Sequence, residues 1–163
     1  MRLATTIAAL VLAADQGSKW FVVAGLRLDE RFFIEVIPGI FNLSMAWNRG
    51  INFGLFASDS DAARWGLIAL ALAISGWVWL WAWRQRENRL MQVSAGFLVG
   101  GALGNVTDRL TWGAVADFIN VTCCGIANPY AFNLADAAIF IGAIGLILFG
   151  GRKTTRDGPG DMR

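Results

Sequence analysis

Two polar residues interrupt an apolar stretch near the C-terminal end of the sequence. Asn133 and Asp136 lie in AFNLADAAIF (131–140), and a spacing of three residues places them on one face of a helix. An ionisable side chain inside a bilayer costs about 2.5–3.5 kcal/mol on insertion scales, so a carboxylate there is expected to have a partner or a function. Asp117 is the acid that the short preceding loop can bring close to Asp136.

A pair formed by Asp117 and Asp136 could activate water. Two carboxyl groups in a poorly solvated site share one proton, because both cannot ionise cheaply, and their pKa values move apart. One aspartate can then take the proton of a water that attacks an amide carbonyl, while its protonated partner polarises that carbonyl and helps to release the amine. The sequence has no histidine, which excludes Ser-His-Asp and Cys-His catalysis and any histidine-ligated metal site. We therefore expect hydrolysis by two aspartates without a cofactor.

Further polar residues lie in or beside apolar segments that are distant in the sequence. Asp15 and Lys19 are four residues apart with the acid first, so an ion pair within one helix would suffice to explain them. Asn105, Asp108 and Arg109 end another apolar segment, where the two charged residues could simply be interfacial. The expected topology brings all these groups to one depth, near the outer side of the membrane.

The composition indicates a membrane protein, since 56% of the 163 residues are hydrophobic and only 16% are charged. Apolar runs of about 20 residues predict four transmembrane helices. These spans are approximately 3–26, 62–83, 91–110 and 130–150. A cleaved signal peptide is an alternative for the first span, but WFVVAGL (20–26) follows DQGSK (15–19) and makes the segment long enough to cross. We expect a mainly α-helical single domain over residues 1–163, with a flexible basic tail at 151–163.

Basic residues orient these helices. Eight of the fourteen lysines and arginines would share one side: Arg2, Arg84, Arg86, Arg89, Arg152, Lys153, Arg156 and Arg163. By the positive-inside rule both termini are then cytoplasmic, and the loops 27–61 and 111–129 face outward.

The first outer, periplasmic loop has a pattern of its own. RFFIEVI (31–37), Pro38-Gly39 and IFNLSMAWN (40–48) predict two strands around a turn, which would form a small sheet on the membrane surface. INFGLF (51–56) could be an amphipathic interfacial segment. Elsewhere, Gly96, Gly100 and Gly104 repeat every four residues and predict a face for close helix packing. The adjacent Cys123 and Cys124 suit neither a disulfide nor a metal site.

Five motifs in order resemble the lipoprotein signal peptidase family, bacterial signal peptidase II. They are DQGSKW (15–20), WNRGINFG (47–54), GGALGNVTDR (100–109), VADFI (115–119) and FNLADAAI (132–139). The resemblance implies an aspartic endopeptidase of the bacterial inner membrane. Such an enzyme removes the signal peptide of a prolipoprotein on the N-terminal side of a diacylglyceryl-modified cysteine. It also implies membrane lipids as partners, inhibition by the cyclic peptide globomycin, and no nucleic-acid partner.

The same resemblance assigns roles to residues. Asp117 and Asp136 would form the catalytic dyad. Substrate or dyad would be positioned by Asn48, Asn105, Arg109 and Asn133. Asp15, Lys19 and Asp108 would be supporting polar residues.

Three other classes of protein remain as alternatives. A small proton- or ion-coupled transporter would place polar residues at several depths, whereas the cytoplasmic halves of these spans carry almost no charge. A Ser-Lys peptidase would need Ser18 or Ser44 with Lys19, but adjacent side chains on a helix do not face each other. A purely structural membrane protein leaves Asp136 unexplained.

Overall fold

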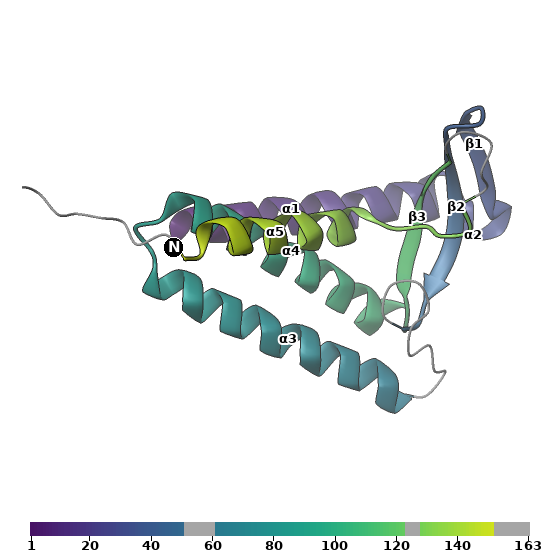
Figure 1. Ribbon diagram of the computed structural model, residues 1–163. Coiled ribbons are helices and arrows are strands. Elements are labelled where there is room, and N and C mark those ends of the chain that lie inside the picture. The colour runs from purple at the N-terminus through teal and green to yellow at the C-terminus, as the bar shows by residue number, and fades with distance from the viewer. Residues whose placement is uncertain (51–60, 123–127, 152–163) are drawn as a thin grey trace, which may run out of the picture.

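In the part of the chain that the structure describes, four helices of 16 or more residues form a bundle, and a small sheet crosses one end of it (Figure 1). The computed structural model describes residues 1–50, 61–122 and 128–151. The long helices are α1 (Arg2–Trp20), α3 (Asp61–Arg84), α4 (Arg89–Thr111) and α5 (Leu134–Phe149). A π-helical turn, η1 (Phe21–Gly25), continues α1. The N-terminus and the end of α5 lie at the end opposite the sheet (Figure 1).

Within the described ranges, three helices are long and apolar enough to cross a membrane: Arg2–Gly25, Asp61–Arg84 and Arg89–Thr111. They match three of the predicted spans. The fourth, α5, is apolar but has only 16 residues, and it starts at Leu134 rather than at Tyr130. Asn133 ends the extended segment before it and caps the helix, since its side-chain oxygen accepts a hydrogen bond from the backbone N–H of Asp136. A helix over the whole predicted span 130–150 is therefore too long at its N-terminal end, because residues 130–133 are not helical.

α4 is the central helix, and its glycines allow close contact with α1. A Cβ atom added at Gly100 would lie 2.7 Å from the carbonyl oxygen of Ala8, and one at Gly96 would lie 2.8 Å from that of Ala4. Gly104 continues this face next to Asp15. The predicted packing face is confirmed, because any side chain at these glycines would push the two helices apart.

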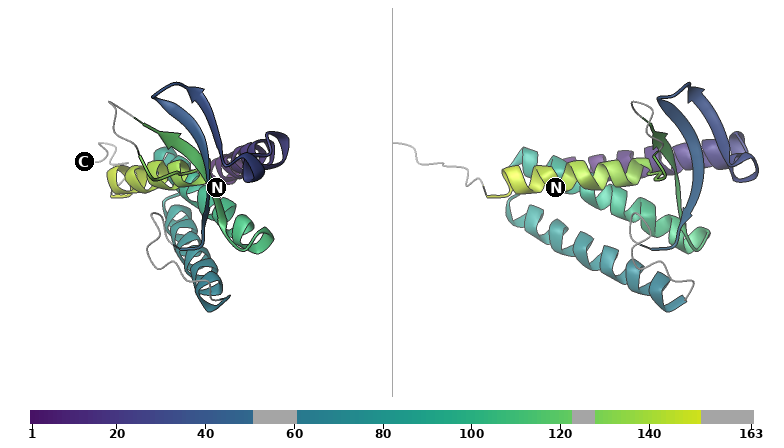
Figure 2. Two further views of the ribbon diagram at one scale, coloured as in Figure 1. Left: turned by 90° about the vertical axis from the view of Figure 1, so that its right-hand side faces the viewer. Right: turned by 45° about the vertical axis from the view of Figure 1, so that its right-hand side comes forward.

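The sheet has the order β1-β2-β3 and is antiparallel throughout. Strands β1 (Phe33–Ile37) and β2 (Phe41–Asn48) form the predicted hairpin, with Gly39 in its turn at φ 70°. Between η1 and β1 lies a one-turn helix, α2 (Leu28–Arg31), that the sequence did not predict. Figure 2 shows the sheet lying across the end of the helices.

The third strand, β3 (Val115–Val121), corrects the expectation of a plain loop between the last two spans. A strand with one solvent-exposed face alternates apolar and polar residues strictly. VADFI lacks this alternation because most of β3 is buried. It pairs with β2, so that Asp117 lies opposite Ala46. Asp117 is thereby held in a sheet rather than in a loop.

A small apolar cluster anchors the sheet to the helices. Val22 of η1, Leu28 of α2, Leu43 of β2 and Phe118 of β3 are buried together. The predicted interfacial segment 51–56, the cysteine pair 123–124 and nearly all of the predicted tail (152–163) lie outside the described residues.

Candidate active site

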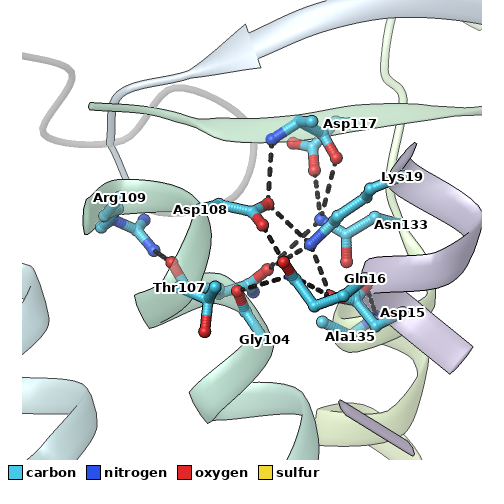
Figure 3. A network of polar contacts seen from close by, with 12 residues as sticks. Asp15, Gln16, Lys19, Gly104, Thr107, Asp108, Arg109, Asp117, Asn133 and Ala135 are labelled. Carbon is cyan, nitrogen blue, oxygen red and sulfur yellow. Dashed lines mark hydrogen bonds and ion pairs between the residues drawn. The ribbon is translucent and has the colours of Figure 1, made fainter. Parts of the chain in front are cut away.

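The sequence-predicted polar residues meet where the sheet contacts the helices. Figure 3 labels part of this set, namely Asp15, Lys19, Asp108, Arg109, Asp117 and Asn133. The residues of the whole set come from the end of α1, the end of β2, the end of α4, the middle of β3 and the start of α5. The expectation that separate segments deliver polar groups to one end of the bundle is confirmed geometrically. The list is Asp15, Lys19, Asn48, Asn105, Asp108, Arg109, Asp117, Asn133 and Asp136.

Asp117 is buried on β3, with 3% of its surface exposed. Its Oδ1 accepts a hydrogen bond from Nδ2 of Asn133 at 2.6 Å, and its Oδ2 accepts one from Nδ2 of Asn48 at 3.1 Å. Burial, together with the negative charge of Asp136, raises the pKa of Asp117 to about 7, against the opposing effect of the two amide donors and Lys19. A carboxyl group with this pKa can hold or release a proton near neutrality.

Asp136 lies in the first turn of α5, and one of its two carboxylate oxygens accepts a side-chain hydrogen bond. Its Oδ1 accepts a hydrogen bond from Nδ2 of Asn105 at 2.9 Å. Its Oδ2 is buried and has no hydrogen-bond partner among the residues that the structure describes. A buried, unpaired carboxylate oxygen is costly, so it marks a place where water or another molecule would bind.

Two asparagines join the acids. Asn133 donates to Asp117 and also accepts from the backbone N–H of Asp136, so a single side chain contacts both acidic residues. Asn105 donates to Asp136, and its Oδ1 lies 3.4 Å from both Nδ2 of Asn133 and Nζ of Lys19. The two carboxyl groups are thus held by one set of amide contacts.

Arg109 is buried next to the acids rather than exposed at the interface. Its guanidinium donates to the carbonyl oxygens of Gly50 at 2.7 Å and Asn105 at 3.3 Å. Asn48 contacts the same turn, because its Oδ1 accepts from the backbone N–H of Gly50 at 3.0 Å. Arg109 and Asn48 therefore connect the end of β2 with the carboxyl groups.

A network of buried charged side chains lies next to Asp117 and Asp136. Nζ of Lys19 is 2.8 Å from Oδ2 of Asp15 and 2.6 Å from Oδ2 of Asp108, and all three side chains are fully buried. The ion pair predicted within α1 is confirmed, but Lys19 is shared with α4. The alternative that Asp108 and Arg109 are interfacial charges is wrong, because the tertiary fold covers that end of α4 with β3.

Gln16 belongs to this network, although sequence reasoning did not select it. Its Nε2 donates to Oδ1 of Asp108 at 2.8 Å and to the carbonyl oxygen of Gly104 at 3.2 Å. The available signal was a polar amide beside Asp15 and Lys19 in an otherwise apolar segment.

A cavity of about 300 Å³ opens beside Asp136, between α3, α4 and α5. Its walls are mostly apolar, with Leu67, Leu70 and Ile74 of α3 facing Leu98 and Ala102 of α4 and Ile139 of α5. Asn105, Arg109 and Asp136 line the same cavity. A ligand with a long apolar part could therefore fill the cavity and place a polar group at Asp136.

The described residues include no group of three or more His, Cys, Asp or Glu side chains placed to hold a metal ion. The fold and site define a class: a membrane protein with two coupled carboxyl groups at one end of a helical bundle, beside an apolar cavity.

Comparisons with known proteins identify the family. The profile of signal peptidase (SPase) II matches residues 7–150. The chain is 40% identical over 137 residues to the lipoprotein signal peptidase of Methylorubrum extorquens (strain PA1), covering 84% of this chain and 78% of that protein. It is 47% identical over 139 residues to that of Methylobacterium radiotolerans, covering 85% and 80%.

Solved structures agree with this result. A bacterial membrane enzyme solved at 2.3 Å resolution superposes with a TM-score of 0.79 at 25% identity, covering 100% of this chain and 96% of that one. A second bacterial membrane enzyme, solved at 1.9 Å, gives a TM-score of 0.77 at 27% identity and covers 94% and 96%. The chain belongs to the signal peptidase II family and is therefore a membrane protease.

Proposed function

We propose that this protein is an aspartic endopeptidase that removes signal peptides from prolipoproteins, with Asp117 and Asp136 as its catalytic dyad. It would cleave on the N-terminal side of the diacylglyceryl-modified cysteine. The observation that carries the proposal is the electrostatic coupling of a buried Asp117 to Asp136, whose Oδ2 is unpaired within the described residues. The printed names of its relatives, lipoprotein signal peptidases, support the substrate class.

The dyad would work with one shared proton. The ionised carboxylate takes a proton from water as the water oxygen attacks the scissile carbonyl, and the protonated partner donates a hydrogen bond to the carbonyl oxygen. A tetrahedral intermediate forms. When it collapses, the C–N bond breaks, and the departing amine receives the proton that the dyad took from water. The dyad then again holds one proton between two carboxyl groups.

The neighbouring residues would position the substrate. The apolar cavity suits the hydrophobic part of a lipid-modified substrate, and its polar end lies at Asp136. Asn48 and Arg109 carry hydrogen-bond donors but no proton that is exchanged near neutral pH, so they are assigned to holding peptide carbonyls. Asn105 and Asn133 orient the carboxyl groups through the contacts described above.

In this proposal residues 1–163 form one peptidase domain with four membrane spans. α5 would be the fourth, since 16 helical residues extend about 24 Å and the extended segment before them adds length. Both termini would be cytoplasmic and the sheet periplasmic, in a bacterial inner membrane.

The buried charged residues among those described gather at the sheet end of the helices. They are Asp15, Lys19, Asp108, Arg109 and Asp117 (Figure 3). This one-sided arrangement favours a peptidase over a transporter.

The direct test is cleavage of a diacylglyceryl-modified prolipoprotein by the purified protein in lipid. A shortened product is expected, and globomycin should block its formation. Asp117→Asn and Asp136→Asn should each abolish cleavage, because asparagine nearly matches the shape of aspartate but cannot exchange the proton. The double variant should be hardly worse than either single one. Activity within a few-fold of wild type in either single variant would contradict the dyad.

A further inference from the structure

Each dyad aspartate follows an alanine whose backbone N–H is bound by a buried carboxylate. The N–H of Ala135, before Asp136, donates to Oδ1 of Asp15 at 2.9 Å. The N–H of Ala116, before Asp117, donates to Oδ2 of Asp108 at 3.2 Å. The two carboxylates come from different helices, α1 and α4, yet each contacts the residue next to one member of the dyad.

Lys19 connects these two anchors. Its Nζ lies 2.8 Å from Asp15 and 2.6 Å from Asp108, and all three side chains are fully buried (Figure 3). Gln16 supports both carboxylates, since its Nε2 donates to Oδ2 of Asp15 at 3.1 Å and to Oδ1 of Asp108 at 2.8 Å. A chain of contacts therefore runs from Ala135 through Asp15, Lys19 and Asp108 to Ala116.

We propose that Asp15, Lys19 and Asp108 act as one positioning unit that sets the distance between the carboxyl groups of Asp117 and Asp136. The inference rests on the proposed function, because it concerns the same dyad. Asp15 fixes the first turn of α5, Asp108 fixes β3 at Asp117, and Lys19 holds the two carboxylates together. None of the three exchanges a proton with the substrate.

A role limited to stability accounts poorly for this arrangement. Removing a charged group from water costs several kcal/mol per ion, and apolar side chains of similar size often serve stability as well or better. Here the carboxylates are directed at two particular backbone groups. The backbone of α4 also makes room for one of them, since a Cβ at Gly104 would lie 2.5 Å from Oδ2 of Asp15.

The positive charge of Lys19 also changes the pKa of the dyad. Lys19 lowers the pKa of Asp117, against the larger effect of burial and of Asp136, which raise it. Replacing Lys19 by an uncharged residue of similar length should therefore raise the pKa of Asp117 further. The pH at which the dyad loses its shared proton would move upward. A side chain that only fills space would not produce this shift.

The test compares Lys19→Met with Gln92→Met in the full-length protein reconstituted in lipid. Gln92 is a buried polar residue of α4 whose Nε2 donates to the carbonyl of Arg86, near the end of α4 away from the dyad. For Lys19→Met, kcat should fall by about 100-fold, as expected for a misplacement of about 1 Å, while KM stays within about threefold of wild type. The alkaline limb of its pH profile should move to higher pH. Gln92→Met should keep the wild-type kcat and pH profile.

Asp15→Asn provides a second variant if Lys19→Met does not fold. Asparagine retains an oxygen for the N–H of Ala135 but loses the charge that pairs with Lys19, so its kcat should lie between those of wild type and Asp15→Ala. Wild-type kcat in a folded Lys19→Met or in Asp15→Ala, or an unshifted pH limb in Lys19→Met, would overturn this inference and leave the proposed function standing. Absence of cleavage by the wild-type protein would instead overturn the proposed function and the inference with it.

Discussion

At the scale of single residues, the two aspartates of the proposed dyad have different surroundings. Both oxygens of Asp117 accept hydrogen bonds from amide side chains, whereas Oδ2 of Asp136 has no partner within the described part of the chain. Asparagine donors stabilise an ionised carboxylate, and burial opposes ionisation. For Asp117 the balance gives a pKa of about 7.

Cleavage should depend on the shared proton. Because burial and Asp136 raise the pKa of Asp117 to about 7, the pair keeps its proton below this pH and loses it as the pH rises further. The rate constant kcat/KM should therefore fall above pH about 7, approaching a tenfold decrease per pH unit. A pH series with one lipid-modified substrate measures this. A rate that rises steadily from neutral to alkaline pH would show that a fully ionised dyad is the active form.

The positioning residues should behave differently from the dyad. Asn48→Ala and Arg109→Ala remove contacts to Asp117 and Gly50 without removing a carboxyl group, so cleavage should fall by about 10- to 100-fold but remain measurable. Rates are compared at substrate concentrations well below saturation, with Asp117→Asn as the inactive reference. Wild-type rates in both variants would mean that the end of β2 plays no part in alignment.

At the scale of elements, the contact between α1 and α4 carries Asp15 to the start of α5. Gly104 permits this contact, since a side chain at this position would meet both the Asp15 carboxylate and Ala135. The helices are therefore packed by small residues at the same position where the buried charges meet. Packing and site geometry depend on one another here.

Gly104→Ala should disturb both the packing of α1 against α4 and the geometry of the site. The added Cβ would lie 2.5 Å from Oδ2 of Asp15 and 3.3 Å from Cβ of Ala135, so overpacking should cost about 1–3 kcal/mol and reduce cleavage. Gly76→Ala in α3 is the matched control, because a Cβ there meets nothing within 4 Å. Thermal unfolding in detergent and the cleavage assay measure the two effects. Equal stability and equal activity of both variants would show that α1 moves freely to accept the methyl group.

At the scale of the whole molecule, the sheet lies at one end of the helices, and the N-terminus and the end of α5 lie at the other (Figure 1). If the basic residues set the orientation, the sheet is periplasmic and the α3–α4 connector, with Arg84, Arg86 and Arg89, is cytoplasmic. The proposed peptidase would then meet its substrate after export.

Thiol labelling tests this orientation. Glu35 on β1 and Glu87 in the connector are both exposed, so each can be changed to cysteine in a protein with Cys123→Ser and Cys124→Ser. In spheroplasts, a membrane-impermeant reagent should label Glu35→Cys and should label Glu87→Cys only after lysis. Labelling of the connector in intact spheroplasts would reverse the assigned topology.

Residue types and local patterns were sufficient for the membrane class, three of the helices, the β1–β2 hairpin and the set of polar residues that meet at one end. These features depend on apolar run length, alternation and turn residues, which are properties of short segments. Beyond the Asp15–Lys19 ion pair and the closeness of Asp117 to Asp136, the tertiary structure decided which polar groups became partners. VADFI is a strand only because β2 lies beside it, and α5 begins at Leu134 because Asn133 caps it while binding Asp117. Lys19 is shared between Asp15 and Asp108 because glycines let α1 approach α4. The distance between these two helices cannot be predicted from a local sequence pattern.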